Sequence, residues 1–464
     1  MIILEVVALF WEYLTFFQQL NVYVILFWIY LFVFIVLFCI SSFGKQLGLR
    51  DKYIQILLKV FEFGCSKVKS KRKRGVSVSE GDDDDDDDED EEDEVEPKYL
   101  SLDQKCFEML PVPTSSDRRN YHFEDIFPYV TDGISTIIHD DVIPQFISEE
   151  LPYWNLLSRN NDRAYEFVSI RLTVFWLIGF IIRYCLLLPL RLIILFVGMM
   201  LFFFCSVIIG PFPNGLFKRN MNSKIIISCF DFVAGSLSLV ATFHDIENRP
   251  KCGIAVANHT SPIDSMILAT DNCYDMVGQK HGGLLGFFMN VLSRNSFHIW
   301  FERSEARDRA HVTKRLKDHA LNPDLPPVLI FPEGVCVNNT CVMQFKKGAF
   351  EVVDKIHPIA IKFDSRFGDA FWWQDQFFNY VLYMMTSWAI VCDVWYLPPM
   401  ERREDESALN FAHRVKSAIA EKGGLMNVSW DGFLKAAPIK AEWKGKYQQA
   451  FAQQLLGVIK NEKE

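Results

Sequence analysis

The chain has 464 residues, half of them hydrophobic, so a catalytic domain with accessory segments is expected rather than one small core. The apolar residues come in long runs, which argues against a wholly soluble protein. The net charge is −10, but a run of 13 acidic residues at 82–94 accounts for it, and the rest of the chain carries +3. The 11 cysteines are scattered, without Cys-x-x-Cys or zinc-finger spacing, which favours a reduced domain facing the cytosol.

The N-terminal region predicts a membrane anchor at residues 1–45. Its apolar stretch, 22–40, is long enough to cross a hydrocarbon core of roughly 30 Å. Basic residues follow it, with a dense cluster at 67–74, and this excess places the following segment in the cytosol and Met1 in the lumen. Without a basic region before the apolar stretch or a clear cleavage site after it, the segment reads as a retained anchor.

Residues 46–120 predict a linker, first basic and then acidic. The acidic run has almost no apolar surface to bury, so we expect the linker to be disordered and solvated. A cytosolic helical segment at 121–170 is expected to follow it.

A second apolar block at 172–209 is interrupted by Arg183, Pro189 and Arg191. We expect a membrane hairpin over 171–210, which either crosses twice or dips into one leaflet. Both versions return the chain to the cytosol, whereas a single crossing would place the following domain in the lumen. A third apolar run at 377–397 contains polar residues and predicts a buried helix and a core strand instead of a span.

Residues 211–464 predict an α/β domain. Short β-like runs alternate with segments of helical composition, and this alternation favours a sheet flanked by helices. The expected strands are 253–257, 328–331, 358–363 and 390–396, and the expected helices are 303–320 and 406–421.

The end of the first expected strand carries a His and an Asp five residues apart. Ser261 can cap a helix that begins at Pro262, which places His259 on the turn and Asp264 in the first helical turn. An imidazole can take a proton from an alcohol, and a nearby carboxylate can fix its tautomer. Taken alone, such a pair is better explained by a capped helix start, so the pair by itself does not indicate catalysis.

Three further blocks follow in order. The block 300–303 ends in Arg303, whose guanidinium matches a phosphate. The block 331–334 contains a carboxylate and a glycine and leads to two lysines at 346 and 347, and the apolar strand 358–361 comes last. Each block also has an ordinary structural explanation, as a surface cation, a turn or a core strand.

Taken together, the four blocks resemble the glycerophospholipid acyltransferase family, whose ordered motifs are His-x4-Asp, an Arg-bearing block, a Pro-Glu-Gly block and an apolar Pro strand. The likeness is closer to the endoplasmic-reticulum glycerol-3-phosphate acyltransferases, the pair numbered three and four. It extends over most of the chain and includes the stretches 151–159, 300–305 and 386–392.

The resemblance implies an α/β fold with an acyltransferase-type mixed sheet flanked by helices and N-terminal membrane helices. It implies that His259 is the general base and Asp264 its partner. Substrate contacts are expected from Arg303, Glu333 and Gly334, which the resemblance implies, and from Lys346 and Lys347, which follow from charge alone.

One position departs from the family pattern. The third motif usually has Thr after Glu-Gly, and this chain has Val335, followed by Cys336 where many relatives carry Arg. If the missing hydroxyl bonds substrate or positions the loop, its loss costs the roughly 0.5–1.5 kcal/mol of one hydrogen bond. We therefore expect reduced rather than abolished activity.

The expected reaction is direct transfer of a fatty-acyl group from acyl-CoA to the sn-1 hydroxyl of glycerol 3-phosphate, with the oxyanion held by amides near the Pro262 helix start. Acyl-CoA is a co-substrate, and no cofactor or metal is expected. The lipid bilayer is the expected partner, nucleic acid is not, and the expected location is the cytosolic face of the endoplasmic-reticulum membrane, or a lipid droplet. The alternatives are a lysophosphatidate acceptor and a catalytically weakened membrane scaffold.

Overall fold

The computed structural model describes residues 24, 28–33, 35–36, 49–76, 143–148, 156–157, 170–213, 215–280, 282–301, 306–373 and 376–432. Of these, the side chains of 67–76, 143–144, 284–285, 287–288, 292 and 306–311 are not described. The chain divides into two compact units, 1–69 with 142–438 and 70–141 with 439–464. The acidic run, Arg303 and most of the expected anchor and helical segment lie outside the described residues.

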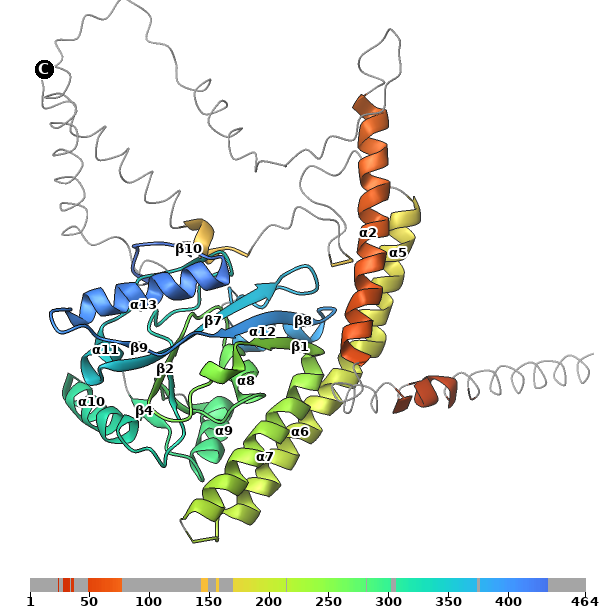
Figure 1. Ribbon diagram of the computed structural model, residues 1–464. Helices are drawn as coiled ribbons and strands as arrows, with labels where there is room; N and C mark the ends of the chain where they lie inside the picture. The colour runs from red at the N-terminus through yellow and green to blue at the C-terminus, as the bar shows by residue number, and fades with distance from the viewer. Residues whose placement is uncertain are drawn as a thin grey trace, which may run out of the picture. The chain divides into compact units, whose positions relative to one another are not determined.

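An eight-stranded mixed sheet forms the centre of the larger unit (Figure 1). Its order is β1-β8-β7-β2-β5-β3-β4, with β9 paired to β7. All pairs are parallel except β7 with β8 and β7 with β9. The strands are β1 (Leu239–His244), β2 (Ile254–Ala257), β3 (Asp275–Gln279), β4 (Ile299–Phe301), β5 (Val328–Ile330), β7 (Lys355–Asp364), β8 (Ile390–Tyr396) and β9 (Met400–Glu401).

Helices cover both faces of this sheet, as the α/β expectation required. Ala255 and Ala257 of β2 enter one core cluster with residues of α8 and α12, while Ile254 and Val256 enter the other with residues of α11 and α13. The alternation of side chains along a strand explains this division. The helices are α7 (Leu216–Ala234), α8 (Asp264–Ala269), α9 (Gly283–Ser293), α10 (Ala306–Ala320), α11 (Gly348–Val352), α12 (Phe377–Met385) and α13 (Ala408–Gly423).

Two smaller features complete the domain. Strands β6 (Cys341–Val342) and β10 (Met426–Asn427) form a separate parallel pair. The run 377–397 is a helix, α12, followed by the core strand β8, as the sequence predicted. The expected strands and helices of the domain are therefore confirmed, with shifts of a few residues at their ends.

The block 170–209 is one continuous helix, and the expected hairpin over 171–210 is not present. It consists of α5 (Ile170–Ile181), a π-helical turn (Ile182–Leu187) and α6 (Leu188–Ile209). Pro189 is the second residue of α6, directly after the π-helical turn. Its missing N–H would have bonded a carbonyl of that turn, and the local change of helix type accommodates the proline without ending the helix. Helix α7 then packs back along α6 (Figure 1).

Two arginines in the middle of this helix, Arg183 and Arg191, donate hydrogen bonds to other parts of the protein. Arg191 is 1% exposed and donates to the carbonyl oxygens of Met385, Ser387 and Trp388 and to Ser238 Oγ. Arg183 donates to Thr386 O at 3.1 Å. The middle of the helix is thus fixed to the loop between α12 and β8, which explains why these charges do not end it.

The opposite side of this helix is apolar and exposed. Phe196, Phe204 and Ile208 are each about 60% exposed. Among the described residues, only Ile170–Ile209 is long and apolar enough to cross a membrane. Length and composition alone are weak evidence of membrane association, since the core helix of a soluble protein passes the same test.

Helix α2 (Leu49–Val76) replaces the first third of the expected disordered linker. Leu57 and Phe61 are buried in a cluster with Phe367 and Trp388 of the catalytic domain. Tyr53 donates its hydroxyl to Trp388 O at 3.0 Å. Apolar burial therefore orders this segment, which the sequence analysis had included in the disordered linker.

Candidate active site

The loop after β2 leaves the sheet at the carboxyl end of this strand. Asn258 is 2% exposed, and its side-chain amide exchanges two 2.8 Å hydrogen bonds with the backbone of Ile361 on β7. These bonds hold the strand end, so the next residue, His259, projects from a fixed point. Its side chain is 19% exposed.

His259 and Asp264 meet as the sequence predicted. His259 Nδ1 lies 2.9 Å from Asp264 Oδ2. The same oxygen accepts the backbone N–H of Thr260 at 2.8 Å and of Ser261 at 2.9 Å. Because the fully buried carboxylate can only accept, Nδ1 carries a proton and Nε2 is left as the atom that can take one.

The helix start differs in detail from the expectation. Helix α8 begins at Asp264, two residues after Pro262, and Ser261 Oγ accepts from the backbone N–H of Ile263 at 3.2 Å. Ser261 Oγ also bonds the Tyr380 hydroxyl at 2.5 Å. Since the amides of residues 260, 261 and 263 already have acceptors, they do not form the oxyanion site expected there.

Glu333 supports the His259 loop through the backbone. It is fully buried, Oε1 accepts the N–H of His259 at 2.8 Å, and Oε2 accepts the N–H of Met343 at 2.8 Å. Burial raises the pKa of Glu333 to about 7 although both amides favour the charged form. The structure therefore gives Glu333 a bracing position, in place of the substrate contact that the resemblance implied.

Cys336 completes the surroundings of the imidazole. Its Sγ lies 3.4 Å from His259 Nε2, the ring nitrogen that does not face Asp264. The Phe331 ring stacks on the imidazole with a centroid distance of 4.3 Å, and Val337 donates its N–H to His259 O at 2.9 Å. The sequence offered no signal for this contact, because 77 residues separate Cys336 from His259.

Comparisons with known proteins show the family of the chain. Residues 240–362 match the family model described as Acyltransferase. "Glycerol-3-phosphate acyltransferase 3-like" of Danio rerio is 43% identical over 421 residues, which cover 90% of this chain and 93% of the relative. "Glycerol-3-phosphate acyltransferase 4" of Homo sapiens is 42% identical over 435 residues, 92% of this chain and 94% of the relative.

The chain belongs to the family of glycerol-3-phosphate acyltransferases 3 and 4. A solved structure, the 1-acyl-sn-glycerophosphate (LPA) acyltransferase PlsC from Thermotoga maritima, is also similar. Its sequence identity is 15% and the TM-score is 0.39, with 53% of this chain and 95% of that chain covered.

In this acyltransferase, the Pro-Glu-Gly loop lies next to one of the two expected lysines. Gly334 has φ +70°, and a Cβ added there would lie 2.8 Å from Lys346 Nζ. The backbone conformation and the lysine both favour glycine at this position. Lys347 instead pairs with Glu351 at 2.8 Å on the surface, and this contact leaves it less suited to bind substrate.

The neighbours of His259 make its imidazole a stronger base. Burial lowers the pKa of His259, but the neighbouring Cys336 and Asp264 raise it by more, so that it lies well above its usual value of 6.5.

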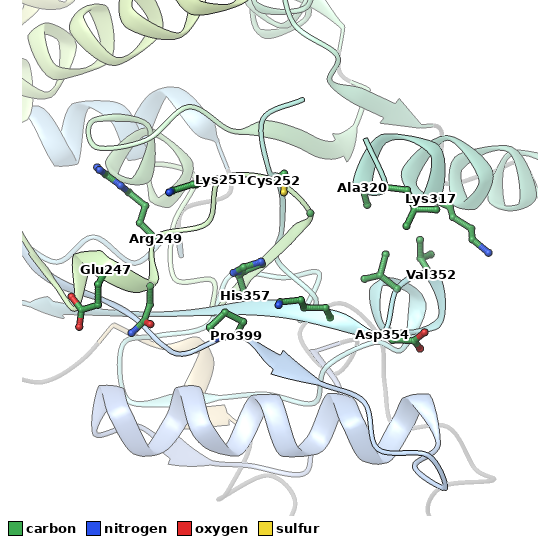
Figure 2. A pocket seen from close by; sticks show the side chains of 15 residues that line it. Glu247, Arg249, Lys251, Cys252, Lys317, Ala320, Val352, Asp354, His357 and Pro399 are labelled. Atoms are coloured by element: carbon green, nitrogen blue, oxygen red, sulfur yellow. The ribbon is translucent and has the colours of Figure 1, made fainter. Parts of the chain in front are cut away.

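A cavity of about 670 Å³ lies elsewhere on the acyltransferase domain (Figure 2). Its lining includes Cys252, just before β2, and His357, near the start of β7. The cavity therefore lies at the amino-terminal ends of β2 and β7, whereas His259 follows the carboxyl end of β2. Among the described residues, no group of three or more His, Cys, Asp or Glu side chains could hold a metal ion.

Proposed function

We propose that the chain transfers a fatty-acyl group from acyl-CoA to the sn-1 hydroxyl of glycerol 3-phosphate, which yields lysophosphatidic acid and CoA. Relatives named glycerol-3-phosphate acyltransferase 3 and 4, each about 42% identical over nine tenths of the chain, support this acceptor. The observation that carries the chemistry is the 2.9 Å contact between His259 Nδ1 and Asp264 Oδ2. It leaves Nε2 ready to take a proton.

In the proposed reaction, the acceptor hydroxyl attacks an acyl thioester while His259 Nε2 takes its proton. The buried Asp264 carboxylate stabilises the imidazolium, which then protonates the departing thiolate. General-base help of this kind contributes roughly 10²- to 10⁴-fold to the rate. Glu333 and Phe331 hold His259 by its backbone and its ring, so the base needs no rearrangement.

The phosphate of the acceptor is proposed to bind cations at the rim of this site. Lys346 is exposed, and its Nζ lies over Gly334 in the loop that also carries Cys336. Arg303 is the second candidate by resemblance, since a guanidinium binds phosphate in a bidentate manner. Lys347 is a weaker candidate because of its pair with Glu351.

The proposed location is the cytosolic face of the endoplasmic-reticulum membrane. Arg191 stands in the middle of the helix 170–209 and is bonded to the catalytic domain, so a crossing at this point would carry the polar domain into the bilayer. If only the exposed apolar side of this helix is inserted into one leaflet, the polar domain stays outside the bilayer. Asn258-His259-Thr260 is a glycosylation sequon, and the side-chain nitrogen of Asn258 is buried in a hydrogen bond that a glycan would break, which supports the cytosolic side.

An assay of the purified chain in detergent tests the proposal. Acyl-CoA is supplied with radiolabelled glycerol 3-phosphate or with lysophosphatidate, and labelled products are counted for the wild type, His259→Ala and His244→Ala. His244 is a matched control, since it also pairs with an aspartate, Asp393, but on the surface.

We expect transfer to glycerol 3-phosphate by the wild type and by His244→Ala, and a loss on the order of 10³-fold in His259→Ala. Transfer to lysophosphatidate but not to glycerol 3-phosphate would show that lysophosphatidate is the acceptor. Equal activity of His259→Ala and the wild type would favour the alternative that the chain is a membrane scaffold.

A further inference from the structure

The Asp264 carboxylate is held through one of its two oxygens. Oδ2 lies 2.9 Å from His259 Nδ1 and accepts the backbone N–H groups of Thr260 and Ser261 at 2.8 and 2.9 Å. No donor among the described residues bonds Oδ1, which is buried. Because a carboxylate without a bond at its second oxygen can turn, its direction depends on the two backbone N–H groups, and hence on where Ser261 lies.

Ser261 is fixed in turn by a residue of another element. Its Oγ lies 2.5 Å from the hydroxyl of Tyr380, which stands on α12, 119 residues further along the chain. Ser261 is fully buried and Tyr380 is 1% exposed. A buried hydroxyl costs free energy unless it is hydrogen-bonded, and a phenylalanine ring would fill the same space without that cost. The bond to the catalytic loop therefore accounts for the hydroxyl at position 380.

Helix α12 is fixed at its carboxyl end to the helix 170–209. Tyr380 stands five residues before Met385, the last residue of α12, which is about 7.5 Å along a helix. Ser387, just beyond this end, donates its hydroxyl to the carbonyl oxygen of Tyr383, within α12. Arg191 donates to three carbonyl oxygens at the same end, those of Met385, Ser387 and Trp388. The position of α12 therefore depends on the helix that carries Arg191.

The helices concerned also share one core. Tyr380 and Met384 of α12 are buried in a cluster with Ile267 and Leu268 of α8, and Leu188 of α6 packs against this cluster. Close packing sets the separation of these helices. The Tyr380 hydroxyl adds a directional bond at the end of α8 that carries the catalytic aspartate.

We propose that Tyr380 is a positioning residue, through which the helix 170–209 holds the His259–Asp264 pair in its catalytic arrangement. The proposal rests on the function proposed above and leaves direct transfer unchanged. Tyr380 acts through Ser261, whose backbone N–H directs the Asp264 carboxylate toward the imidazole.

This link connects the apolar helix to the rate of acyl transfer. A displacement of the loop after α12 moves Tyr380, and the Asp264 carboxylate then loses its direction toward Nδ1. An imidazole without a well-placed carboxylate is less well oriented and a weaker base. The turnover should fall as a result, whereas the binding of acyl-CoA and glycerol 3-phosphate does not depend on this bond.

The variant Tyr380→Phe removes the hydroxyl and keeps the ring in the core. Tyr383→Phe is the matched control, because Tyr383 lies on the same helix but is 36% exposed. The purified full chains in detergent are assayed with acyl-CoA and glycerol 3-phosphate over a series of pH values. Over the same series, the modification of His259 by diethyl pyrocarbonate is followed by mass spectrometry, since the reagent attacks the unprotonated imidazole.

For Tyr380→Phe we expect kcat to fall about 3- to 10-fold at unchanged KM for both substrates. The acid limb of kcat/KM and the modification curve of His259 should both move to lower pH, because the imidazole holds its proton less tightly without a well-placed Asp264. The substitution keeps the other titratable neighbours of His259, which are Cys336 and Glu333. Loss of folded protein would lower the rate without moving either curve, and Tyr383→Phe should match the wild type.

A double-mutant cycle tests the link to the helix. Arg191→Met should lower kcat as well, and Tyr380→Phe should add little to its effect, because both substitutions act on the position of α12. If Arg191→Met does not fold, Arg183→Met takes its place in the cycle, since it removes one hydrogen bond to the same loop, at Thr386 O.

A Tyr380→Phe enzyme with the wild-type kcat, or with unshifted pH curves, would overturn the proposal and leave the proposed function intact. Fully additive effects in the cycle would also overturn it, because Tyr380 would then act independently of the helix. A wild type that does not acylate glycerol 3-phosphate contradicts the proposed function itself, and the modification curves of the same variants then decide on Tyr380.

Discussion

The Glu333 carboxylate accepts the backbone N–H of His259 at 2.8 Å, so the third sequence block holds His259 by its main chain. The other oxygen of the carboxylate accepts the N–H of Met343, also at 2.8 Å. One side chain thus joins the loop after β2 to the segment leading away from the Pro-Glu-Gly turn. Its contribution to activity is positional.

Replacing Glu333 by Gln tests this position. The Gln amide can accept only one of the two N–H groups, and its NH₂ group then faces the other donor. We expect the free energy of unfolding to fall by about 1–3 kcal/mol and kcat to fall with it, as measured by thermal unfolding and acyl transfer. Glu351→Gln, on the surface beside Lys347, is the control and should change neither. A stable, fully active Glu333→Gln enzyme would refute the bracing position.

Glu333 also predicts a pH dependence of stability. Its pKa is about 7 in the folded chain and 4.5 in the unfolded one, and burial is the main cause. Since the folded value is the higher, the contribution of Glu333 to stability is fully present below pH 4.5 and is lost as the pH rises through 7. Unfolding measured between pH 5 and 8 should show this loss in the wild type and lack it in Glu333→Gln. Identical pH profiles of the two proteins would contradict the raised pKa of Glu333.

Asp275 is predicted to anchor both ends of the segment that contains Arg303. This buried carboxylate pairs with His298, just before β4, and with His319, at the end of α10. Burial raises its pKa, but hydrogen bonds from the two histidines hold it at about 2. Because the folded pKa is the lower, this stabilisation is present above pH 3.8 and lost as the pH falls through 2.

Asp275→Asn should therefore reduce the free energy of unfolding by about 3–5 kcal/mol, because the buried charge is lost and the amide keeps only one acceptor oxygen for the two histidines. It should also raise the KM for glycerol 3-phosphate more than it lowers kcat if the segment 298–319 binds the phosphate. Thermal unfolding and initial rates measure the two effects. The exposed Asp318 on α10 provides the control, and an Asp318→Asn variant as unstable as Asp275→Asn would argue against a specific anchor.

Arg191 is predicted to hold the apolar helix to the catalytic domain. Arg191→Met removes the donor that bonds the carbonyl oxygens of Met385, Ser387 and Trp388. Trp388 O keeps the Tyr53 hydroxyl, and the loss at each of the other two buried oxygens costs about 1–3 kcal/mol. We expect faster proteolysis within 170–209 and a lower unfolding temperature in detergent. Arg171, exposed near the start of α5, supplies the matched variant Arg171→Met, for which we expect wild-type behaviour. Equal protease resistance of all three proteins would contradict the anchoring.

Val335→Thr tests the departure from the family motif. Val335 is half-buried, and a Cβ added at Gly432 would lie only 2.2 Å from Val335 Cγ2, so the site accepts a residue of unchanged shape such as Thr. If the hydroxyl bonds substrate or loop, kcat/KM should rise about 2- to 10-fold, in keeping with a hydrogen bond of about 0.5–1.5 kcal/mol. Kinetics with glycerol 3-phosphate measure this rise, and an unchanged kcat/KM would show that Val335 does not reduce activity.

The local part of the site could be predicted from the sequence. His259 and Asp264 are five residues apart on a strand, turn and helix, and such a short connection fixes their distance once the elements form. The strands of the domain could also be predicted, because short apolar runs between helical segments are typical of strands in an α/β core. The block 170–209 was predicted less well, because Arg183 and Arg191 looked like interruptions within their own segment.

The sequence by itself determined the α/β class, the position of the His259–Asp264 pair and the apolar character of 170–209, since each depends on residues close together in the chain. The tertiary structure alone decided that Glu333 braces the base, that Cys336 lies against Nε2 and that the helix stays unbroken. These three results depend on partners 74, 77 and about 200 residues away. Local patterns carry no information on such contacts, because only the closing of the sheet and the docking of the helix bring the partners together.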